Sequence, residues 1–439
     1  MSTIWQWFSQ AFATLDIDSM NVFILGSGGR EHALAWKSAQ DDDSKVFVAP
    51  GNGGTLLEDH ITNLNVDIND FDAVATACKD HAIDLVIVGP EVPLVNGIVD
   101  YLAAKDILAF GPTAKAARLE GSKVFAKEFF KKYAIPTAGY QSFTNFEEAS
   151  DYAKSVNYPI VIKADGLAAG KGVVICNSKE EALETLNEML NNAAFGDAGN
   201  QVILEEFLKG EEASFIAVVA GNKILPLATS QDHKTIFEND TGPNTGGMGA
   251  YSPAPIVTES IHKQVMSEVM QRAADGLIQE SSPFYGFLYA GLMIDGDKIK
   301  VLEFNCRFGD PETQPILMRL ETSLNKICMA ALQDKLDTIN IEWKKESAVG
   351  VVISAPGYPG NYPTGSKITL PATENSNTKI FHAGTKLDQS SLVTNGGRVL
   401  CVTALGRDLA DAQKSVYQTI QSIEFDGMYF RKDIGNKAL

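Results

Sequence analysis

The stretch at residues 302–314, which reads LEFNCRFGDPETQ, constrains the fold most because it places many charges directly after a core strand. The run IKVLEF at residues 299–304 is rich in apolar, β-prone residues and predicts that strand. Glu303 and Asn305 are two residues apart, so a strand presents both on one face. A carboxylate and an amide oxygen are hard ligands for Mg²⁺, which completes its shell with phosphate and water. Arg307 adds a fixed cation beside them.

Two interpretations of the acid and the amide remain open when they are taken alone. Glu303 and Asn305 fit a metal site, but they also fit a polar strand end before an ordinary Asp310–Pro311 turn. The whole stretch favours the metal site, since so many charges beside a core strand need partners. Cys306 is expected to be a small buried hydrophobe that points away from the two ligands.

The stretch resembles the signature of the glycinamide ribonucleotide synthetases, also called phosphoribosylamine–glycine ligases, which are ATP-grasp ligases of purine synthesis. The resemblance extends over about residues 20–435. It implies ATP as co-substrate, Mg²⁺ or Mn²⁺ on Glu303 and Asn305, and Arg307 as the catalytic cation at the transferring phosphoryl group. It also implies a glycyl phosphate intermediate that phosphoribosylamine captures. No serine, cysteine or histidine stands in a nucleophile–base arrangement, so no covalent enzyme intermediate is expected.

Length, charge and cysteine content limit the number of domains and the kinds of partner that this chain can have. A chain of 439 residues is too long for one core, so about three domains are expected. The net charge of −18 argues against a nucleic-acid or anionic-membrane surface, and no run of 18 apolar residues predicts a membrane helix. The five scattered cysteines form no Cys-x-x-Cys pair, which argues against a zinc ribbon or a disulfide framework. We expect a cytoplasmic monomer that acts on small molecules.

Residues 1–19 precede the first clear strand and carry apolar residues at helical spacing, such as Ile4, Phe8 and Phe12. They have no basic n-region and no continuous apolar core, so they do not predict a secretory signal. The sequence that resembles the family starts at Met20. We interpret residues 1–19 as an accessory helix or as residues upstream of the true start, and expect them to be dispensable for catalysis.

A strand at residues 21–25 runs into the glycine turn GSGGRE and a helix, an arrangement that offers backbone amides to an anion. The turn also fits simple strand–helix packing, whereas an NAD site would need a glycine where Glu31 stands. Another strand, at residues 84–88, ends in Gly-Pro-Glu, again at a carboxyl end where parallel sheets bind ligands. The resemblance assigns both loops to phosphoribosylamine. The residues expected there are Gly28, Gly29, Arg30, Glu31, Pro90 and Glu91.

A helix is predicted at residues 123–133, with Ser122 as its N-cap. Two lysines lie one turn apart on it. The resemblance promotes Lys123 as a contact of the nucleotide phosphates, whereas we interpret Lys127 as an ordinary solvated lysine.

A glycine-rich hairpin loop at residues 164–172 follows a strand that ends in Lys163, and it contains Lys171. It is not a Walker loop, because no G-x-x-x-x-G-K-[ST] run opens a helix. A mobile surface hairpin is the alternative interpretation. The resemblance implies the lid of an ATP-grasp enzyme, with Lys163 on the α- and β-phosphates and Lys171 also at ATP.

The strand at residues 201–204 continues through the linker EEFLKGEE into another strand at residues 213–220. Such a linker leaves backbone N–H and C=O groups for an adenine edge, although a charged hairpin turn fits it too. By resemblance, the expected adenine contacts are Glu205, Glu206, Phe207 and Leu208, with Glu212 at the ribose hydroxyls.

The segment at residues 241–251 is dense in glycine, which marks backbone that a ligand or another segment approaches closely. The resemblance implies substrate contacts in this segment and in the stretch just before it at residues 230–234, namely Asp232, Thr245, Gly246, Gly247, Met248 and Gly249. Thr235 and the pair Glu238-Asn239 depart from the family pattern, which leaves local loop contacts open. His233 is interpreted as a hydrogen-bonding loop histidine rather than as a general base.

The fold expected is multidomain, α/β and α+β: an N-terminal Rossmann-like parallel sheet, an ATP-grasp core with a small lid subdomain, and a C-terminal α+β cap that helps to close the phosphoribosylamine site. The expected limits are 1–19, 20–121, 122–200, 201–340 and 341–439. Two other functions remain open: a different ATP-grasp enzyme, such as a carboxylase or a formate-dependent ligase, and an NAD-dependent dehydrogenase built on the first domain.

Overall fold

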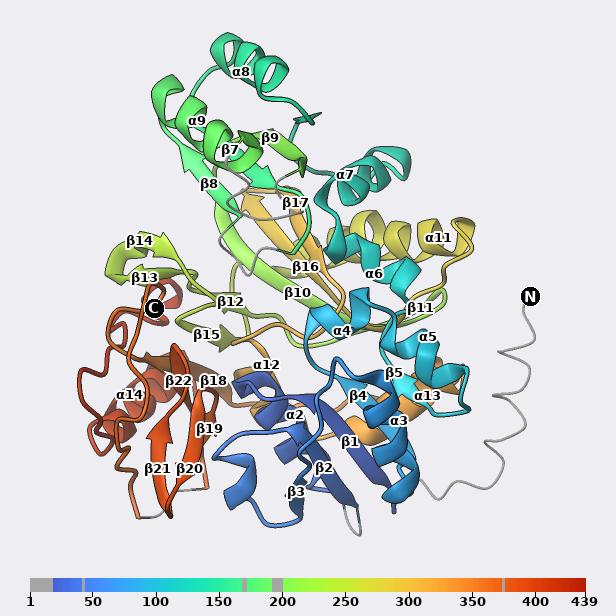
Figure 1. Ribbon diagram of the computed structural model, residues 1–439, viewed down its shortest axis with the longest axis vertical. Coiled ribbons are helices and arrows are strands. Elements are labelled where there is room, and N and C mark those ends of the chain that lie inside the picture. Colours follow the sequence, from blue (N-terminus) through green and yellow to red (C-terminus); the bar gives the residue numbers. More distant parts are fainter. Residues whose placement is uncertain (1–18, 42–43, 168–171, 192–199, 373–375) are drawn as a thin grey trace.

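The computed structural model describes residues 19–41, 44–167, 172–191, 200–372 and 376–439. Figure 1 shows the N-terminal unit and the C-terminal unit side by side in the lower half of the molecule, with a central sheet above them and a small unit at the top. The multidomain α/β and α+β architecture predicted from the sequence is confirmed.

The N-terminal unit is a five-stranded sheet with the order β3-β2-β1-β4-β5, and all of its strand pairs are parallel. All four residues of β4 are buried, as expected for a parallel strand covered on both faces. The elements are β1 (Asn21–Gly26), α2 (Gly29–Ser38), β2 (Lys45–Pro50), η2 (Thr55–Leu57), β3 (Ile61–Asn63), α3 (Phe71–Asp80), β4 (Leu85–Val88), α4 (Glu91–Val95), α5 (Ile98–Ala103), β5 (Ala109–Phe110) and α6 (Ala114–Gly121).

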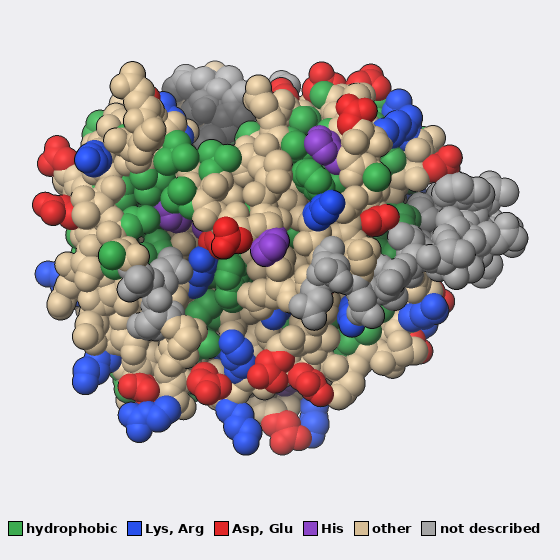
Figure 2. Space-filling view, turned by 90° about the horizontal axis from the view of Figure 1, so that it is seen from below, with side chains coloured by type: hydrophobic (Ala, Val, Ile, Leu, Met, Phe, Trp, Pro, Cys, Tyr) green, Lys and Arg blue, Asp and Glu red, His purple; other side chains and the backbone are tan. Residues whose placement is uncertain are grey.

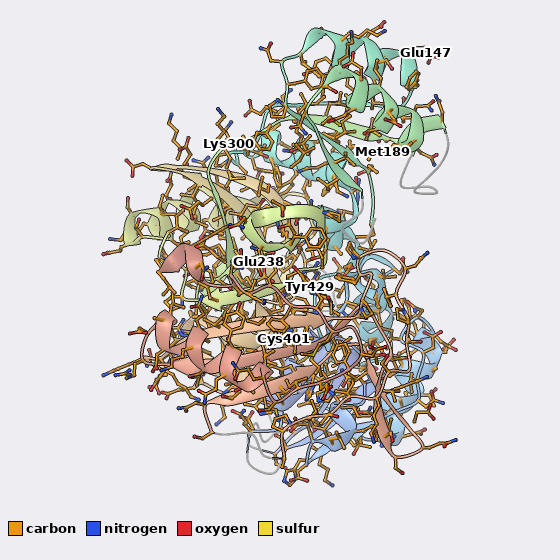
Figure 3. The ribbon with its side chains drawn as sticks, turned by 90° about the vertical axis from the view of Figure 1, so that its left-hand side faces the viewer. Glu147, Met189, Glu238, Lys300, Cys401 and Tyr429 are labelled. Atoms are coloured by element: carbon orange, nitrogen blue, oxygen red, sulfur yellow. The ribbon has the colours of Figure 1, made fainter. Side chains whose placement is uncertain are left out.

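The small upper unit is a four-stranded antiparallel sheet with the order β6-β9-β7-β8. It encloses a hydrophobic core of its own, which includes Ile162, Leu186 and Val202. Figure 3 shows Glu147 and Met189 in this unit, well above Cys401 in the lower body. The elements are β6 (Tyr140–Phe143), α8 (Phe146–Ser155), β7 (Ile160–Ala164), β8 (Val173–Cys176), α9 (Lys179–Leu186), η3 (Asn187–Asn191) and β9 (Val202–Glu206).

The central sheet has the order β11-β10-β16-β17 and is antiparallel. Asp295 pairs with Lys298 across the hairpin that joins β16 to β17. The N-cap assigned to Ser122 is confirmed, because its hydroxyl accepts from the Phe125 amide at 3.1 Å. The elements are α7 (Lys123–Lys132), β10 (Glu211–Ala220), β11 (Lys223–Pro226), α10 (Glu259–Val265), η6 (Met266–Met270), α11 (Gln271–Gln279), β16 (Tyr285–Asp295), β17 (Lys298–Asn305), α12 (Thr313–Arg319), α13 (Leu324–Leu332) and η7 (Leu336–Thr338).

The C-terminal unit is built on a five-stranded sheet with the order β12-β15-β18-β22-β19. Two of these strands come from the middle of the chain, since Gly249 of β15 pairs with Val351 of β18. The domain limits remain a prediction. The elements are β12 (Gln231–Asp232), β13 (Thr235–Phe237), η5 (Glu238–Asp240), β14 (Thr241–Asn244), β15 (Gly249–Ser252), β18 (Ser347–Ser354), β19 (Thr378–His382), β20 (Thr385–Asp388), β21 (Ser391–Thr394), β22 (Arg398–Gly406), α14 (Leu409–Ile420) and η8 (Asn436–Ala438).

Buried polar contacts join the first unit to the last. The backbone amide of His382 donates to Nδ1 of His32 at 2.8 Å. Because that ring nitrogen accepts, Nε2 of His32 carries the proton and donates to Glu58 at 3.0 Å. Lys379 also pairs with Glu58, at 2.5 Å. The strand β19 is thereby fixed against the N-terminal helix α2.

Replacing Glu58 by Gln should remove a stabilisation that depends on pH. Burial alone would raise the pKa of Glu58, but the hydrogen bonds from His32 and Lys379 and the positive charge of Lys379 lower it to about 2. A carboxylate of this kind stabilises the fold above its unfolded pKa of about 4.3, and the contribution is lost as the pH falls toward 2. We expect Glu58→Gln to cost about 1–2 kcal/mol at pH 7 and progressively less below pH 4. Urea titrations of both proteins at several pH values measure this; a pH-independent difference would contradict it.

Acidic and basic side chains are interspersed on the lower face of the molecule, which Figure 2 shows. The described residues on that face do not gather into one broad basic area. In the part of the chain that the structure describes, no helix has the length and apolar character needed to cross a membrane.

Candidate active site

The two candidate metal ligands lie at the end of β17. Across β16, Glu303 is paired with Gly291 and Asn305 with Tyr289. Both ligand side chains are half-buried, whereas Phe304 between them is buried, so the two ligands share the face that the spacing predicted. Among the described residues, no group of three His, Cys, Asp or Glu side chains could hold a metal. A cation at Glu303 and Asn305 would therefore take further ligands from phosphate and water.

Glu303 is surrounded by cations. Burial alone would raise its pKa, but the charge of Lys234 and those of three further cations outweigh burial and lower the pKa. The three are Lys163, Lys123 and Arg307. Glu303 is therefore an anion at neutral pH, as a ligand for a hard cation must be.

Arg307 is held between two carboxylates. Its guanidinium lies 3.0 Å from Oε1 of Glu120 and 3.6 Å from Oε2 of Glu91. It also donates to the carbonyl of Phe308 at 3.2 Å. The contact with Glu91 brings the loop after β4 beside the signature stretch, so these predicted site residues do converge. Glu120 was missed by the sequence analysis, because nothing in its helical context distinguishes it from a structural carboxylate.

Cys306 contributes its backbone rather than its thiol. The side chain is buried, as predicted for a small hydrophobe, and its amide donates to Oε2 of Glu120 at 2.7 Å. Burial raises the pKa of the Cys306 thiol well above its usual value. The thiol is therefore protonated and is not a nucleophile.

Lys127 and Lys163 share the carboxylate of Glu205, at 3.2 Å and 3.0 Å. Lys127 also donates to Oγ1 of Thr137 at 2.7 Å, and its side chain is only 2% exposed. The interpretation of Lys127 as a solvated lysine is therefore wrong. Burial lowers its pKa to about 8. Because Lys127 comes one turn after Lys123, the same inward face of α7 carries both, and this spacing was the signal available.

The start of the glycine-rich loop contacts the N-terminus of α7. Lys123 donates to the carbonyl of Gly166 at 2.7 Å, and the Val124 amide donates to Asp165 at 3.1 Å. Lys123 thus lies at the loop that the resemblance implies as a lid. The central part of that loop, residues 168–171, and with it the predicted ATP contact Lys171, lies outside the described residues.

The predicted adenine linker leaves β9 at Glu206. Glu206 forms an ion pair with Lys300 of β17 at the surface, and Phe207 next to it is 38% exposed. Leu208 is half-buried. Their contacts with adenine, and that of Glu205, remain predictions.

Glu212, the predicted ribose contact, forms an ion pair with Lys234 at 2.9 Å. Lys234 was missed by the sequence analysis, although it lies between Asp232 and Thr245, which were both assigned to substrates. Its charge acts on both Glu212 and Glu303, so one lysine links the predicted ribose contact with the predicted metal ligand.

The glycine turn after β1 is filled by one of its own side chains. The Gly28 amide, expected to face an anion, donates to Oε2 of Glu31 at 2.6 Å. A Cβ atom at Gly26 or at Gly89 would collide with the Glu31 side chain. Glu31 therefore fills the turn, pairs with Arg30 at 2.5 Å and satisfies this amide itself. The Gly28 amide is therefore bonded within the turn, and the assignment of Gly28 to phosphoribosylamine stays a prediction.

The glycine-dense segment is packed between the signature stretch and the C-terminal unit. Arg398 donates to the carbonyl of Gly246 at 2.7 Å and pairs with Asp310 at the same distance. Gly247 has φ +113°, and a Cβ atom there would collide with Pro311. This close approach explains the glycines at positions 246 and 247. Arg398 was missed because it lies 88 residues beyond Asp310.

The other residues predicted in this region are placed as follows. Thr245 donates from its hydroxyl to the carbonyl of Lys234 at 2.8 Å, and Met248 is fully buried. Both the backbone amide and Nδ1 of His233 contact the carbonyl of Gly249, at 2.9 Å and 3.3 Å. Burial lowers the pKa of His233 to about 4. The prediction of a hydrogen-bonding loop histidine is thereby confirmed.

Asp232 stands out electrostatically. Burial raises its pKa to about 8, although the charge of Lys234 opposes this. Such a shift brings its proton exchange close to neutral pH, a property common in functional sites. Asp232 pairs in β12 with Ala250 of the glycine-dense segment.

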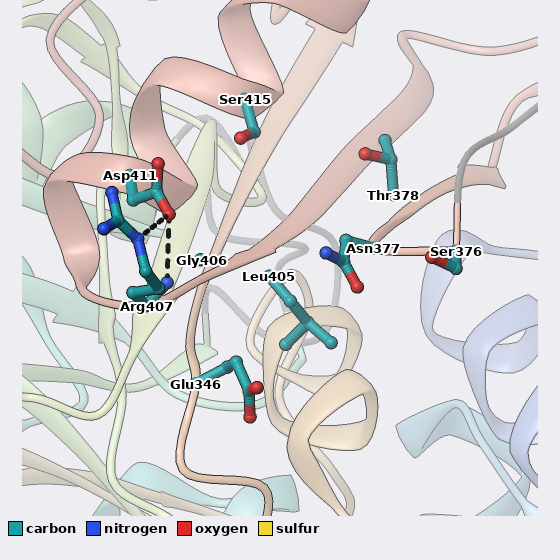
Figure 4. Close-up of a pocket in the computed structure, with 9 residues that line it drawn as sticks. All are labelled: Glu346, Ser376, Asn377, Thr378, Leu405, Gly406, Arg407, Asp411 and Ser415. Carbon is teal, nitrogen blue, oxygen red and sulfur yellow. Dashed lines mark hydrogen bonds and ion pairs between the residues drawn. The ribbon is translucent and has the colours of Figure 1, made fainter.

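Two cavities lie away from these residues. One of about 320 Å³ opens in the C-terminal unit, between Glu346, Thr378 and Asp411 (Figure 4). The other, of about 1110 Å³, lies between β8, the β13–β14 ribbon and the segment around Tyr429. Neither is lined by a predicted site residue.

Comparisons with known proteins agree with the motifs. The phosphoribosylglycinamide synthetase N domain matches residues 20–120, its ATP-grasp (A) domain matches 121–313, and its C domain matches 348–437. The phosphoribosylamine–glycine ligase of Escherichia coli (strain K12) is 54% identical over 424 residues, which covers 96% of this chain and 99% of that protein. The ligase of Vibrio cholerae is 53% identical over 423 residues, with the same coverage.

Solved structures show the same relationship. The phosphoribosylamine–glycine ligase of Thermotoga maritima superposes with a TM-score of 0.83 at 35% identity, over 94% of this chain and all of that one. The biotin carboxylase domain of the Hydrogenobacter thermophilus 2-oxoglutarate carboxylase reaches 0.72 at 16% identity, over 94% and 91%. The carboxylase shares the fold alone.

Proposed function

The chain belongs to the phosphoribosylglycinamide synthetase family, and from that premise we propose how its residues carry out the ligation. It is a ligase that joins glycine to phosphoribosylamine in purine biosynthesis, and it uses ATP with a divalent cation. The observation that carries the proposal is the end of β17, where Glu303 and Asn305 share a face beside the anchored Arg307.

We assign the divalent cation, Mg²⁺ or Mn²⁺, to Glu303 and Asn305. The donor set fits such an ion, because Glu303 is anionic and the amide nitrogen of Asn305 is engaged by Glu120 at 3.1 Å, which leaves its oxygen as the ligand. When bound, the ion would neutralise and orient the triphosphate. Lys123, Lys163 and Lys171 would bind phosphate oxygens of ATP.

The chemistry begins with a carboxylate, which is a poor electrophile because oxide is a poor leaving group. In the proposed route a glycine carboxylate oxygen attacks the γ-phosphorus of ATP, the bond to the β-phosphate oxygen breaks, and ADP leaves. The amine of phosphoribosylamine then attacks the carbonyl of glycyl phosphate, loses a proton and expels phosphate. Arg307 stabilises the charge on the transferring phosphoryl group, because it is a cation fixed in advance by Glu120 and Glu91.

The remaining assignments concern phosphoribosylamine and glycine. We propose that the loops after β1 and β4 bind phosphoribosylamine, through Gly29, Arg30 and Pro90 among others. The support is that β1 and β4 are neighbours in the parallel sheet, where such loops bind ligands. Asp232 and the segment from Thr245 to Gly249 would lie around the substrates, since that segment is packed on the signature stretch.

Labelled glycine tests the glycyl phosphate route. If the glycine carboxylate attacks ATP, the phosphate released in turnover must carry one oxygen that began in glycine. We therefore expect phosphate with one heavy oxygen from glycine labelled with ¹⁸O in its carboxylate, measured by mass spectrometry. Glycine recovered after the reaction controls for washout of the label. Unlabelled phosphate beside fully labelled glycine would rule the route out.

The quaternary state and location belong to the same proposal. We propose that the chain works as a monomer in the cytoplasm, as a small-molecule enzyme of nucleotide synthesis. Analytical sedimentation at micromolar concentration measures the quaternary state, and a dimer at that concentration would contradict the proposed monomer.

A further inference from the structure

Glu120 is a buried carboxylate from outside the signature that contacts three consecutive residues of it. It lies near the end of α6, and its side chain is 5% exposed. Oε1 lies 3.1 Å from the Asn305 amide nitrogen and 3.0 Å from the Arg307 guanidinium. Oε2 accepts from the Cys306 backbone amide at 2.7 Å.

These contacts fix the direction of the Asn305 amide. A backbone amide and a guanidinium can only donate, so both Glu120 oxygens are acceptors, one toward Cys306 and one toward Arg307. Asn305 can therefore turn only its NH₂ group toward Oε1, because its carbonyl oxygen would face a carboxylate oxygen there. The amide oxygen of Asn305 is thereby turned away from Glu120 and is available as a ligand.

We propose that Glu120 is a positioning residue, which presents the Asn305 oxygen to the divalent cation and fixes the Arg307 guanidinium beside it. The proposal rests on the assignment of the cation to Glu303 and Asn305 above. Partners that orient metal ligands commonly change metal affinity 10–100-fold when they are removed. Glu120 belongs to the N-terminal unit, so it also couples that unit to the metal strand β17.

The affinity for Mn²⁺ in the presence of ADP can be measured without turnover. The electron paramagnetic resonance signal of Mn²⁺ reports how much of the ion remains free. We expect Glu120→Gln to weaken Mn²⁺ binding about 10-fold or more, because the new amide can offer Asn305 a donor and let its oxygen turn inward. Asn305→Ala should weaken binding to a similar degree. The double variant Glu120→Gln with Asn305→Asp should bind more tightly than Glu120→Gln alone. In that variant the introduced glutamine amide can donate to one oxygen of the introduced aspartate and leave the other oxygen for the metal.

Glu58→Gln is the matched control, because it also removes a largely buried carboxylate that pairs with a cation but lies away from β17. It should lose stability without a change in Mn²⁺ affinity. If circular dichroism shows that Glu120→Gln is unfolded, Glu120→Asp can replace it. This variant keeps the charge but has a side chain that is shorter by one methylene, and it should also weaken Mn²⁺ binding.

The outcomes distinguish the positioning role of Glu120 from the assignment of the metal to Glu303 and Asn305. Unchanged Mn²⁺ affinity in a folded Glu120 variant, with weakened binding in Asn305→Ala, would overturn the positioning role and leave the metal site standing. Unchanged affinity in both Asn305→Ala and Glu303→Gln would overturn the metal assignment itself. A Glu120→Gln defect that Asn305→Asp does not relieve would overturn the orienting role.

Discussion

Glu303→Gln should lower kcat about 10³-fold, equivalent to about 4 kcal/mol of transition-state stabilisation, while the protein stays folded. The substitution keeps the shape of the side chain but removes the anion that the surrounding cations stabilise. Without that anion the divalent cation binds weakly, and four positive side chains lose one nearby negative charge. Asn305→Ala should lower kcat about 10²-fold, since only a neutral ligand is lost. Both should be partly relieved by high Mg²⁺ concentration.

The measurement is ADP release with glycine and freshly prepared phosphoribosylamine, over a range of Mg²⁺ concentrations. Lys298→Gln is a suitable control, because Lys298 is exposed at the other end of the same strand. It should behave like the unchanged protein. Near-normal activity of Glu303→Gln or Asn305→Ala at low Mg²⁺ would refute the metal assignment.

Arg307→Ala should slow phosphoryl transfer about 10²–10³-fold and raise the KM for ATP by no more than about threefold. A preorganised cation stabilises charge that develops in the transition state more than charge already present in bound ATP. Removing Arg307 also leaves Glu91 and Glu120 without their shared cation, which is expected to cost about 3–5 kcal/mol of stability. Thermal unfolding must therefore be measured beside the kinetics.

Arg307→Lys separates the effect on phosphoryl transfer from the effect on stability. It keeps a positive charge between Glu91 and Glu120 and so should retain most of the stability, but it loses the planar fork. We expect kcat between those of the alanine variant and the unchanged protein. The test is single-turnover kinetics together with calorimetric ATP binding. If ATP affinity falls as much as the transfer rate, Arg307 is a ground-state binding residue instead.

The parts of the site that were predictable are those encoded within a few residues. The two-residue spacing of Glu303 and Asn305 determines a shared strand face, and the Ser122 N-cap follows from local hydrogen bonding. A local signal was available for Glu31 as well. An acidic residue three positions after an N-cap is the mark of a capping box, and this indicates that the Gly28 amide is already satisfied.

The parts that were missed depend on contacts between distant segments. Glu120 lies 186 residues before Cys306, and no periodicity in either segment connects them. Arg398 meets Asp310 only because two separate units pack together. Lys127 was misjudged for a different reason: most lysines on helices are solvated, and the local signal, its one-turn spacing from Lys123, does not show that Glu205 and Thr137 lie behind α7.

The shared sheet of the C-terminal unit limits how this chain can be divided. Along β18, four residues pair with β15, from Gly249 opposite Val351 to Ser252 opposite Ala348. A fragment that began at residue 341 would expose that edge as unpaired backbone next to apolar side chains, which invites self-association. If the chain is divided at that point, the two fragments should associate when they are refolded together, because β15 can then pair with β18. Exchange of the last hundred or so residues between homologues would therefore succeed only when β12 and β15 are exchanged with them.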